Sequence, residues 1–376
     1  MGSMLLAVRE MRRAKGRFGL LTGAVGILVF LVVFQQALLD GLVTEFVGAI
    51  RNQSADVLVY GSDARLNLQG SVVGAGAQAQ VAAVDGVAAA GPLGVATVTV
   101  QAGGDLRDAT LIGHVVGGPG QPARLAAGRR PAADGEAVAN VGDDDQGFGI
   151  GQRVIVQPGG TTIEIVGTAR EVAFSVTPTL FTSYATYEAA RISTNPDARG
   201  VLPSAIAVTV DDGATAAEVA RRINDQVKDV EAADRARAAE EAPGVASVSQ
   251  SFGVILLLAY VVAVIVIGFF FLILTVQKRA TLTLLRAVGV PAGRLVGALA
   301  AQVAAVLAGG IAVGTALAAL ALASPGSGID ARVEPAALAT TTAALFVLAA
   351  LGCAAAASRI VRLDPAAATL PGAGTR

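Results

Sequence analysis

The residues able to support catalysis are few in this sequence of 376 residues, and their neighbours do not complete a reactive group. His114 is the only histidine and Cys353 the only cysteine, so a histidine pair, a cysteine metal cluster and an internal disulfide are excluded. A phosphate-binding loop needs Ser or Thr after its lysine, and none of the three lysines (Lys15, Lys228 and Lys278) has one. We therefore expect no catalytic residue, no metal site and no cofactor in this chain.

Two polar or glycine-rich motifs have the residue types of a ligand site but not the spacing. Asp143-Asp144-Asp145 lacks the alternating acidic positions of a calcium loop, so we expect a solvated turn there. Gly147–Gly151 lies outside any β-α-β unit and is not a dinucleotide-binding loop. We interpret His114 as a polar residue at a strand end. An enzyme active site is not expected.

The composition indicates a membrane protein with a soluble part. Hydrophobic residues make up 53% of the chain and charged residues only 15%, against about 25% charged residues in average soluble domains. Four uncharged stretches reach the length of about 20 residues that crosses a bilayer. We predict transmembrane helices over residues 18–39, 251–277, 295–323 and 336–358, with an outer loop at 324–335.

The arginines and lysines predict the orientation of these helices. Basic residues cluster in three segments, residues 1–17, 278–294 and 359–376, whereas the loop 324–335 holds only Arg332. Because basic residues stay on the cytoplasmic side, both termini are predicted to be cytoplasmic and residues 40–250 to lie outside. This insert has 15 basic and 25 acidic residues, which disfavours binding to nucleic acid.

The insert is predicted to be an α+β domain. Alternating apolar residues predict strands, and turn residues at Pro158-Gly159-Gly160 predict a hairpin. The predicted strands cover residues 55–60, 95–100, 153–156, 162–166 and 205–210. Helices are predicted over 78–84 and 214–230, the second starting after Asp211-Asp212. The charged stretch 231–241 is predicted to continue as a helical stalk into the second span. The complete fold class is thus four transmembrane helices with a large extracytoplasmic α+β domain between helices 1 and 2.

A short basic segment follows the second predicted span. On a helix, Arg279 and Arg286 fall on one face, whereas Leu282 and Leu285 fall on the other, and Gly289 ends it. Such a helix at the cytoplasmic surface has two interpretations. It is either an anchor held by anionic lipid or an element that receives force from a cytoplasmic ATPase.

Residues 275–289, TVQKRATLTLLRAVG, resemble the signature that follows span two in FtsX-like and MacB-like ABC transporter permeases. Thr281 or Leu282 stands where that signature has Glu. Other segments agree with the resemblance: residues 8–17 with the amphipathic N-terminal helix, 151–167 with the MacB-type outer domain, and 362–368 with the typical ending. The order of one span, an insert and three spans is similar too. The length of the insert resembles the DevC-like branch, which includes haem-exporter permeases.

The resemblance implies a permease subunit in a bacterial plasma membrane, embedded in lipid. Its partners would be a second permease protomer, in a homodimer or a heterodimer, and two copies of a cytoplasmic ATPase that holds ATP and Mg²⁺. Of the two dimers we expect the homodimer. A cytoplasmic coupling helix over residues 278–294 would couple the chain to the ATPase through Lys278, Arg279, Leu282, Leu285 and Arg286. ATP-driven motion would pass through rigid helices to the outer domain, as in type VII (mechanotransmission) transporters.

The resemblance leaves three functions open. The first is export or extraction of a hydrophobic or amphiphilic molecule such as haem from the membrane. The second is a mechanotransmitter without transport that regulates an extracytoplasmic hydrolase or sensor, and the third is extraction of lipoproteins.

Four polar residues in or near the spans are candidates for substrate binding, because polar groups within membranes are commonly functional. They are Gln35, Gln36, Glu45 and Tyr260, and Glu45 or Tyr260 would supply an axial ligand if haem is the cargo. Gly41 and Gly48 share a helix face with Glu45, which would let Glu45 approach a dimer mate. Each candidate has a structural alternative: hydrogen bonds between helices for the glutamines, a solvated stalk position for Glu45, and an interfacial anchor for Tyr260.

Overall fold

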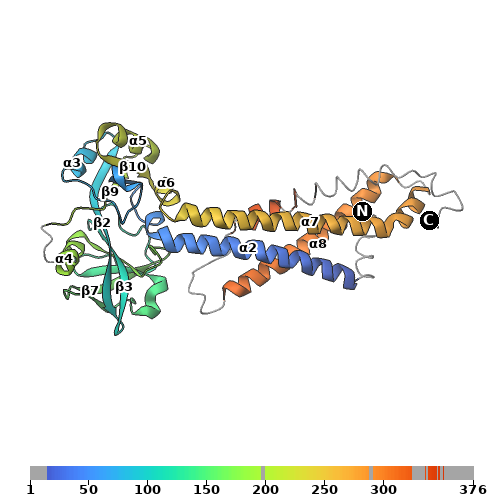
Figure 1. Ribbon diagram of the computed structural model, residues 1–376, viewed down its shortest axis with the longest axis horizontal. Helices are drawn as coiled ribbons and strands as arrows, with labels where there is room; N and C mark the ends of the chain where they lie inside the picture. Colours follow the sequence, from blue (N-terminus) through green and yellow to red (C-terminus); the bar gives the residue numbers. More distant parts are fainter. Residues whose placement is uncertain are drawn as a thin grey trace. The chain divides into compact units, whose positions relative to one another are not determined.

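The computed structural model describes residues 15–195, 200–287, 291–323, 335, 338–344, 346–347 and 350. The chain divides into two compact units. The membrane unit comprises Met1–Leu39 and Ser251–Arg376, and the outer unit comprises Asp40–Gln250, the stretch predicted as an insert. Figure 1 shows both units, which are treated separately below.

The membrane unit is built from long apolar helices. These are α2 (Lys15–Arg51, which continues into the outer unit), α7 (Val245–Ala287, which begins there) and α8 (Ala292–Leu322). Three described segments are long and apolar enough to cross a membrane, namely Phe18–Arg51, Val245–Val266 and Ala301–Leu322. The predicted fourth span, 336–358, lies mostly outside the described residues, and residues 338–344 of it are helical. The predicted outer loop 324–335, except for residue 335, and the predicted tail 359–376 lie outside them. So do residues 1–14 of the cytoplasmic amphipathic N-terminal helix predicted over residues 1–17.

Glycines let α2 and α8 pack closely. A Cβ atom at Gly314 would lie 2.6 Å from the carbonyl oxygen of Gly26, and one at Gly310 would lie 2.5 Å from Val25 Cγ1. Gly310 and Gly314 are four residues apart, the small-residue spacing that brings two helix backbones together in lipid. A larger side chain at Gly310 or Gly314 would therefore clash with α2, so the close packing of α2 and α8 depends on these glycines.

The outer unit contains a ten-stranded sheet in the order β10-β1-β9-β2-β3-β8-β5-β7-β4, with β6 paired to β2 and β7. Its strands are β1 (Val57–Gly61), β2 (Val87–Ala102), β3 (Asp105–His114), β4 (Ala127–Gly128), β5 (Glu136–Asn140), β6 (Arg153–Gln157), β7 (Thr162–Ala169), β8 (Thr179–Ser183), β9 (Ala205–Val210) and β10 (Val230–Asp234). The α-helices lying wholly in this unit are α3 (Ala77–Ala82), α4 (Tyr184–Thr194), α5 (Ala216–Gln226) and α6 (Arg235–Glu240), and the 3₁₀ turns are η1 (Ser62–Ala64) and η2 (Val141–Gln146).

The long strand β2 belongs to both halves of the sheet. Its first residues pair with β9, and its last residues pair with β3 and β6. Each half has its own apolar core: one includes Val59 and Ile223, the other Phe148 and Leu180. In Figure 1, α3 and α5 lie by the first half, and α4 lies by the second. The unit thus has one sheet with two halves, each with its own core, that share strand β2.

The predicted strands are present, and the predicted hairpin joins β6 to β7 in antiparallel register. The predicted helix 214–230 is shorter, because α5 begins after Thr215 and ends at Gln226. Thr215, not Asp211-Asp212, caps it: the side chains of Thr215 and Glu218 form a reciprocal capping box.

The predicted helical stalk 231–241 is wrong in its first part. Val230–Asp234 is strand β10, which pairs antiparallel with β1 and buries Ala232 and Ala233 almost completely. Only Arg235–Glu240 is helical, and Gly244, with φ 90°, separates this helix from α7. Pairing with the edge of β1 therefore overrides the helix propensity of this charged, alanine-rich stretch.

Candidate functional site

Polar side chains meet inside the membrane unit. Gln36 Oε1 accepts a hydrogen bond from Thr341 Oγ1 at 2.8 Å, and the hydroxyl of Tyr260 donates to the same Thr341 oxygen at 3.5 Å. Thr341 is 1% exposed. The side-chain amide of Gln35, also buried, donates to the carbonyl oxygen of Phe252 at 3.2 Å. Three of the four candidate residues are therefore tied to neighbouring helices of their own chain.

These contacts are of the kind that joins helices in membranes, where each hydrogen bond contributes roughly 0.6–2 kcal/mol. They correspond to the structural alternative given above for the glutamines. Thr341 was not among the candidate residues. The signal for it is a run of three threonines, Thr340–Thr342, in an otherwise apolar stretch.

Glu45 lies on α2 within the outer unit and is half-buried. Its carbonyl oxygen accepts a hydrogen bond from the amide of Val176 at 3.0 Å. One turn further, Gly48 faces a loop of the same chain: a Cβ there would lie 2.5 Å from the carbonyl oxygen of Glu171. This part of the glycine face is therefore occupied by the chain itself.

The end of α2 is fastened to that loop, residues 171–176, by its backbone. The amide of Ala49 donates to the carbonyl oxygen of Ala173 at 2.9 Å, and the amide of Ser175 donates to that of Phe46 at 3.1 Å. Asn52 adds a side-chain hydrogen bond of 2.7 Å to the carbonyl oxygen of Glu171. A displacement of the end of α2 would therefore move this loop with it.

The predicted coupling residues Lys278, Arg279, Leu282, Leu285 and Arg286 lie on helical backbone, and their side chains are outside the described part of the structure. In the described residues, the coupling helix predicted over 278–294 is not separate from the helix of the second span. Residues 278–287 are the last turns of α7, and Arg294 belongs to α8. The reason is that no proline interrupts the sequence from Phe252 to Ala287.

His114 and Asp143, both considered in the sequence analysis, are among the buried polar residues of the outer unit. His114 ends β3, as predicted; burial lowers its pKa, and its Nδ1 lies 3.0 Å from the carbonyl oxygen of Val115. Asp143 lies in η2 and is 8% exposed, so the predicted solvated turn is wrong at this residue. Burial raises the pKa of its carboxyl group to about 6. Within the described residues, no three His, Cys, Asp or Glu side chains gather in a group that could hold a metal.

Two family profiles match the chain. The FtsX-like permease C-terminal profile matches residues 253–365, and the MacB-like periplasmic core domain profile matches residues 18–226, more than half of the chain. The chain belongs to the FtsX-like and MacB-like permeases of ABC transporters, as the resemblance in its sequence predicted. A permease of this kind is a membrane subunit that works with a cytoplasmic ATPase.

Relatives of similar length carry the same description. One uncharacterized ABC transporter permease of Mycobacterium tuberculosis (strain ATCC 25618 / H37Rv) is 24% identical over 373 residues, covering 97% of this chain and 99% of its own. A second from the same strain is 25% identical over 301 residues, covering 80% of each chain.

Solved structures match part of the chain at low similarity. The periplasmic region of MacB from Actinobacillus actinomycetemcomitans matches with a TM-score of 0.34 and 13% identity, covering 52% of this chain and 94% of its own. The extracellular domain of the noncanonic ABC-type transporter YknZ from Gram-positive bacteria matches with a TM-score of 0.31 and 15% identity, covering 48% of this chain and 100% of its own. The family assignment rests on the sequence profiles and not on these likenesses.

Proposed function

We propose that this permease carries the stroke of its partner ATPase along α7 and α2 to the outer domain, and thereby exports or extracts an amphiphile such as haem. The observation that carries the proposal is the continuity of α7. Its 43 residues run without interruption from the predicted coupling segment to Val245 in the outer unit. At 1.5 Å per residue such a helix is about 64 Å long, so one rigid element serves both ends.

The fastening of α2 supports the same mechanism. A second helix joins the first predicted span to the outer unit, and its end is bonded to the loop 171–176. With α2 and α7 both joined to the outer unit, one helix can be displaced while the other stays in place. The outer domain would then change shape when the cytoplasmic side closes.

A homodimer completes the proposal. Within the apolar 18-residue stretch of each membrane-spanning segment, only 11% of α7 is buried inside the chain, against 39% of α2 and 33% of α8. Exposed side chains such as Leu257, Val261 and Phe269 lie along α7. This apolar surface of α7 suits contact with a second protomer and with lipid. The orientation is a separate part of the proposal: the basic clusters favour cytoplasmic termini.

The coupling role is tested with Arg286→Glu. Reversing this charge would weaken the contact with the ATPase, so we expect ATP hydrolysis to continue while transport by the reconstituted complex falls at least tenfold. Arg376→Glu, a charge reversal in the predicted cytoplasmic tail outside the family-like segment 362–368, serves as the matched control and should transport normally. Normal transport by Arg286→Glu would refute its coupling role.

The cargo is tested by visible absorption of the purified complex. If haem is bound at Glu45 or Tyr260, we expect a Soret band that shifts in Glu45→Ala or Tyr260→Phe. A colourless complex that neither binds added haem nor changes its ATPase rate with haem would exclude haem as cargo. The mechanism proposed for α7 would survive that result, because it does not depend on the cargo.

Thr341 is hydrogen-bonded to both Gln36 and Tyr260, so these candidate substrate-binding side chains already have partners within the chain. This favours a second candidate, a mechanotransmitter without transport that regulates an extracytoplasmic hydrolase or sensor. The ATPase activity of such a permease's complex would respond to a protein partner and not to a small amphiphile. A permease that extracts lipoproteins would instead respond only to an acylated protein. ATPase assays with each class of molecule separate the three functions.

A further inference from the structure

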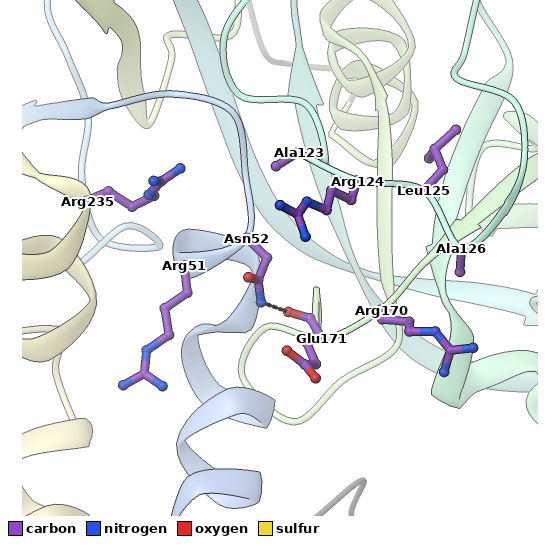
Figure 2. A pocket seen from close by; sticks show the side chains of 9 residues that line it. All are labelled: Arg51, Asn52, Ala123, Arg124, Leu125, Ala126, Arg170, Glu171 and Arg235. Carbon is purple, nitrogen blue, oxygen red and sulfur yellow. Dashed lines mark hydrogen bonds between the residues drawn. The ribbon is translucent and has the colours of Figure 1, made fainter. Parts of the chain in front are cut away.

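A pocket of about 470 Å³ opens in the outer unit at the end of α2. Its polar lining consists of Arg51, Asn52, Arg124, Arg170, Glu171 and Arg235. This volume falls within the range of about 300–1,000 Å³ typical of small-ligand sites. Figure 2 shows these side chains arranged around the pocket.

The charge of the pocket is opposite to that of its domain. Residues 40–250 hold 25 acidic and 15 basic residues, yet four arginines and one glutamate line the pocket. Arg130 adds positive charge next to it, since its guanidinium donates to the carbonyl oxygen of Ala123 in the pocket wall at 3.1 Å. The pocket therefore concentrates positive potential that would attract an anion.

These arginines are only partly satisfied within the chain. Arg235 Nη1 donates to the carbonyl oxygen of Gln53 at 2.8 Å, and Arg51 lies 3.7 Å from a half-exposed carboxylate, that of Asp40. In the part of the chain that the structure describes, Arg124 and Arg170 make no hydrogen bond or ion pair. In Figure 2, Arg124 and Arg235 point towards each other from opposite walls, with Asn52 beside them.

The walls of the pocket are held in place by backbone groups. The amide of Ala123 donates to the carbonyl oxygen of Asn52 at 2.8 Å, and the amide of Ala126 donates to that of Thr168 at 2.7 Å. The Asn52 side chain uses one amide N–H for Glu171 and has a second to offer. A ligand would thus enter a preformed cavity, which lowers the entropy cost of binding.

We propose that this pocket binds a phosphate or a phosphate ester between Arg124 and Arg235. Two facing guanidinium groups repel each other unless an anion lies between them. Their planar donors suit the oxygens of a phosphate, which accept two parallel hydrogen bonds from one guanidinium. Arg51 and Arg170 also line the pocket and add positive charge. The phosphate group could belong to a lipid headgroup or to a soluble phosphate, and the proposal does not depend on the cargo.

The first experiment measures binding of inorganic phosphate to the full chain in dodecyl maltoside micelles, which carry no phosphate group, by equilibrium dialysis. We expect saturable binding that weakens at least tenfold in Arg124→Gln and weakens with added salt. Arg124→Gln removes no contact of the described residues, so it should fold, and its melting temperature checks this. The double variant Arg191→Gln/Arg221→Gln removes two exposed arginines elsewhere on the same domain and should bind as wild type does.

The second experiment tests the lipid source. A photo-crosslinking residue, p-benzoylphenylalanine, replaces Leu125 in the pocket wall, and the full chain is placed in nanodiscs with or without 20% phosphatidylglycerol. A phosphatidylglycerol adduct that is lost in Arg124→Gln identifies a lipid headgroup, whereas phosphate binding without an adduct identifies a soluble phosphate. The proposal is overturned if neither probe binds, or if Arg124→Gln and the double variant bind alike.

Discussion

At the scale of the residue, Asp143 is a carboxyl group that the fold keeps largely from water. It is 8% exposed, and in the described structure its buried Oδ2 has no hydrogen-bond partner. Desolvation disfavours the charged form, which is why the pKa rises to about 6. An ionised Asp143 therefore destabilises the outer domain at neutral pH.

The direction of the pH dependence follows from this pKa. Because the folded state binds the proton more tightly than the unfolded state, the stabilising contribution is complete below pH about 4 and is lost as pH rises through about 6. The shift corresponds to about 3 kcal/mol. We expect the melting temperature of the full chain to fall between pH 5 and pH 7.5, and to fall less in Asp143→Asn.

Asp145→Asn is the control, because Asp145 is an exposed neighbour in the same 3₁₀ turn. Comparing variants cancels the opposite contribution of His114, whose lowered pKa makes the fold less stable as pH falls. Equal pH profiles for wild type and Asp143→Asn would show that Asp143 does not titrate in this range.

At the scale of the element, the contact between α2 and the loop 171–176 depends on one glycine. An alanine at Gly48 would place its Cβ 2.5 Å from the carbonyl oxygen of Glu171 and 3.3 Å from that of Ala173. Both atoms belong to the backbone and do not yield easily. The hydrogen bonds around Ala49 and Asn52 would have to shift as well.

We expect Gly48→Ala to destabilise the chain by about 1–3 kcal/mol, the usual cost of overpacking. The measurement is thermal unfolding of the full chain in nanodiscs. Gly23→Ala, on the same helix, is the matched control: a Cβ there meets no atom within 4 Å, and alanine favours helix over glycine by about 1 kcal/mol. A Gly48→Ala melting temperature at or above that of wild type would contradict the close approach.

At the scale of the whole molecule, the proposed mechanism requires α7 to be stiff. Two glycines inserted between Gln250 and Ser251 would weaken the helix where it passes from one unit to the other. We expect the complex to keep hydrolysing ATP while transport, or activation of an outer partner, falls at least tenfold. The same insertion after Gly160, in the exposed β6–β7 turn, should have no effect. Full activity with the insertion in α7 would argue against force transmission through this helix.

The sequence by itself determined the elements whose signals are local. Long uncharged runs can lower their free energy only by leaving water, so they predicted the membrane helices. Alternation of apolar residues predicted strands such as Ala205–Val210, and Pro158-Gly159-Gly160 predicted a hairpin between two of them. The order of these segments, with the signature at 275–289, was sufficient to indicate the family.

Tertiary structure decided what depends on contacts between distant residues. Val230–Asp234 became a strand because β1 offered an edge, and Asp143 became buried because the half-sheet around Phe148 closed over its turn. Thr341 joined Gln36 across 305 residues of sequence. The arginine pocket draws on residues 51, 124, 170 and 235, which no local pattern links. Local propensity fixes what a segment can become, whereas burial and pairing with remote segments select which side chains meet.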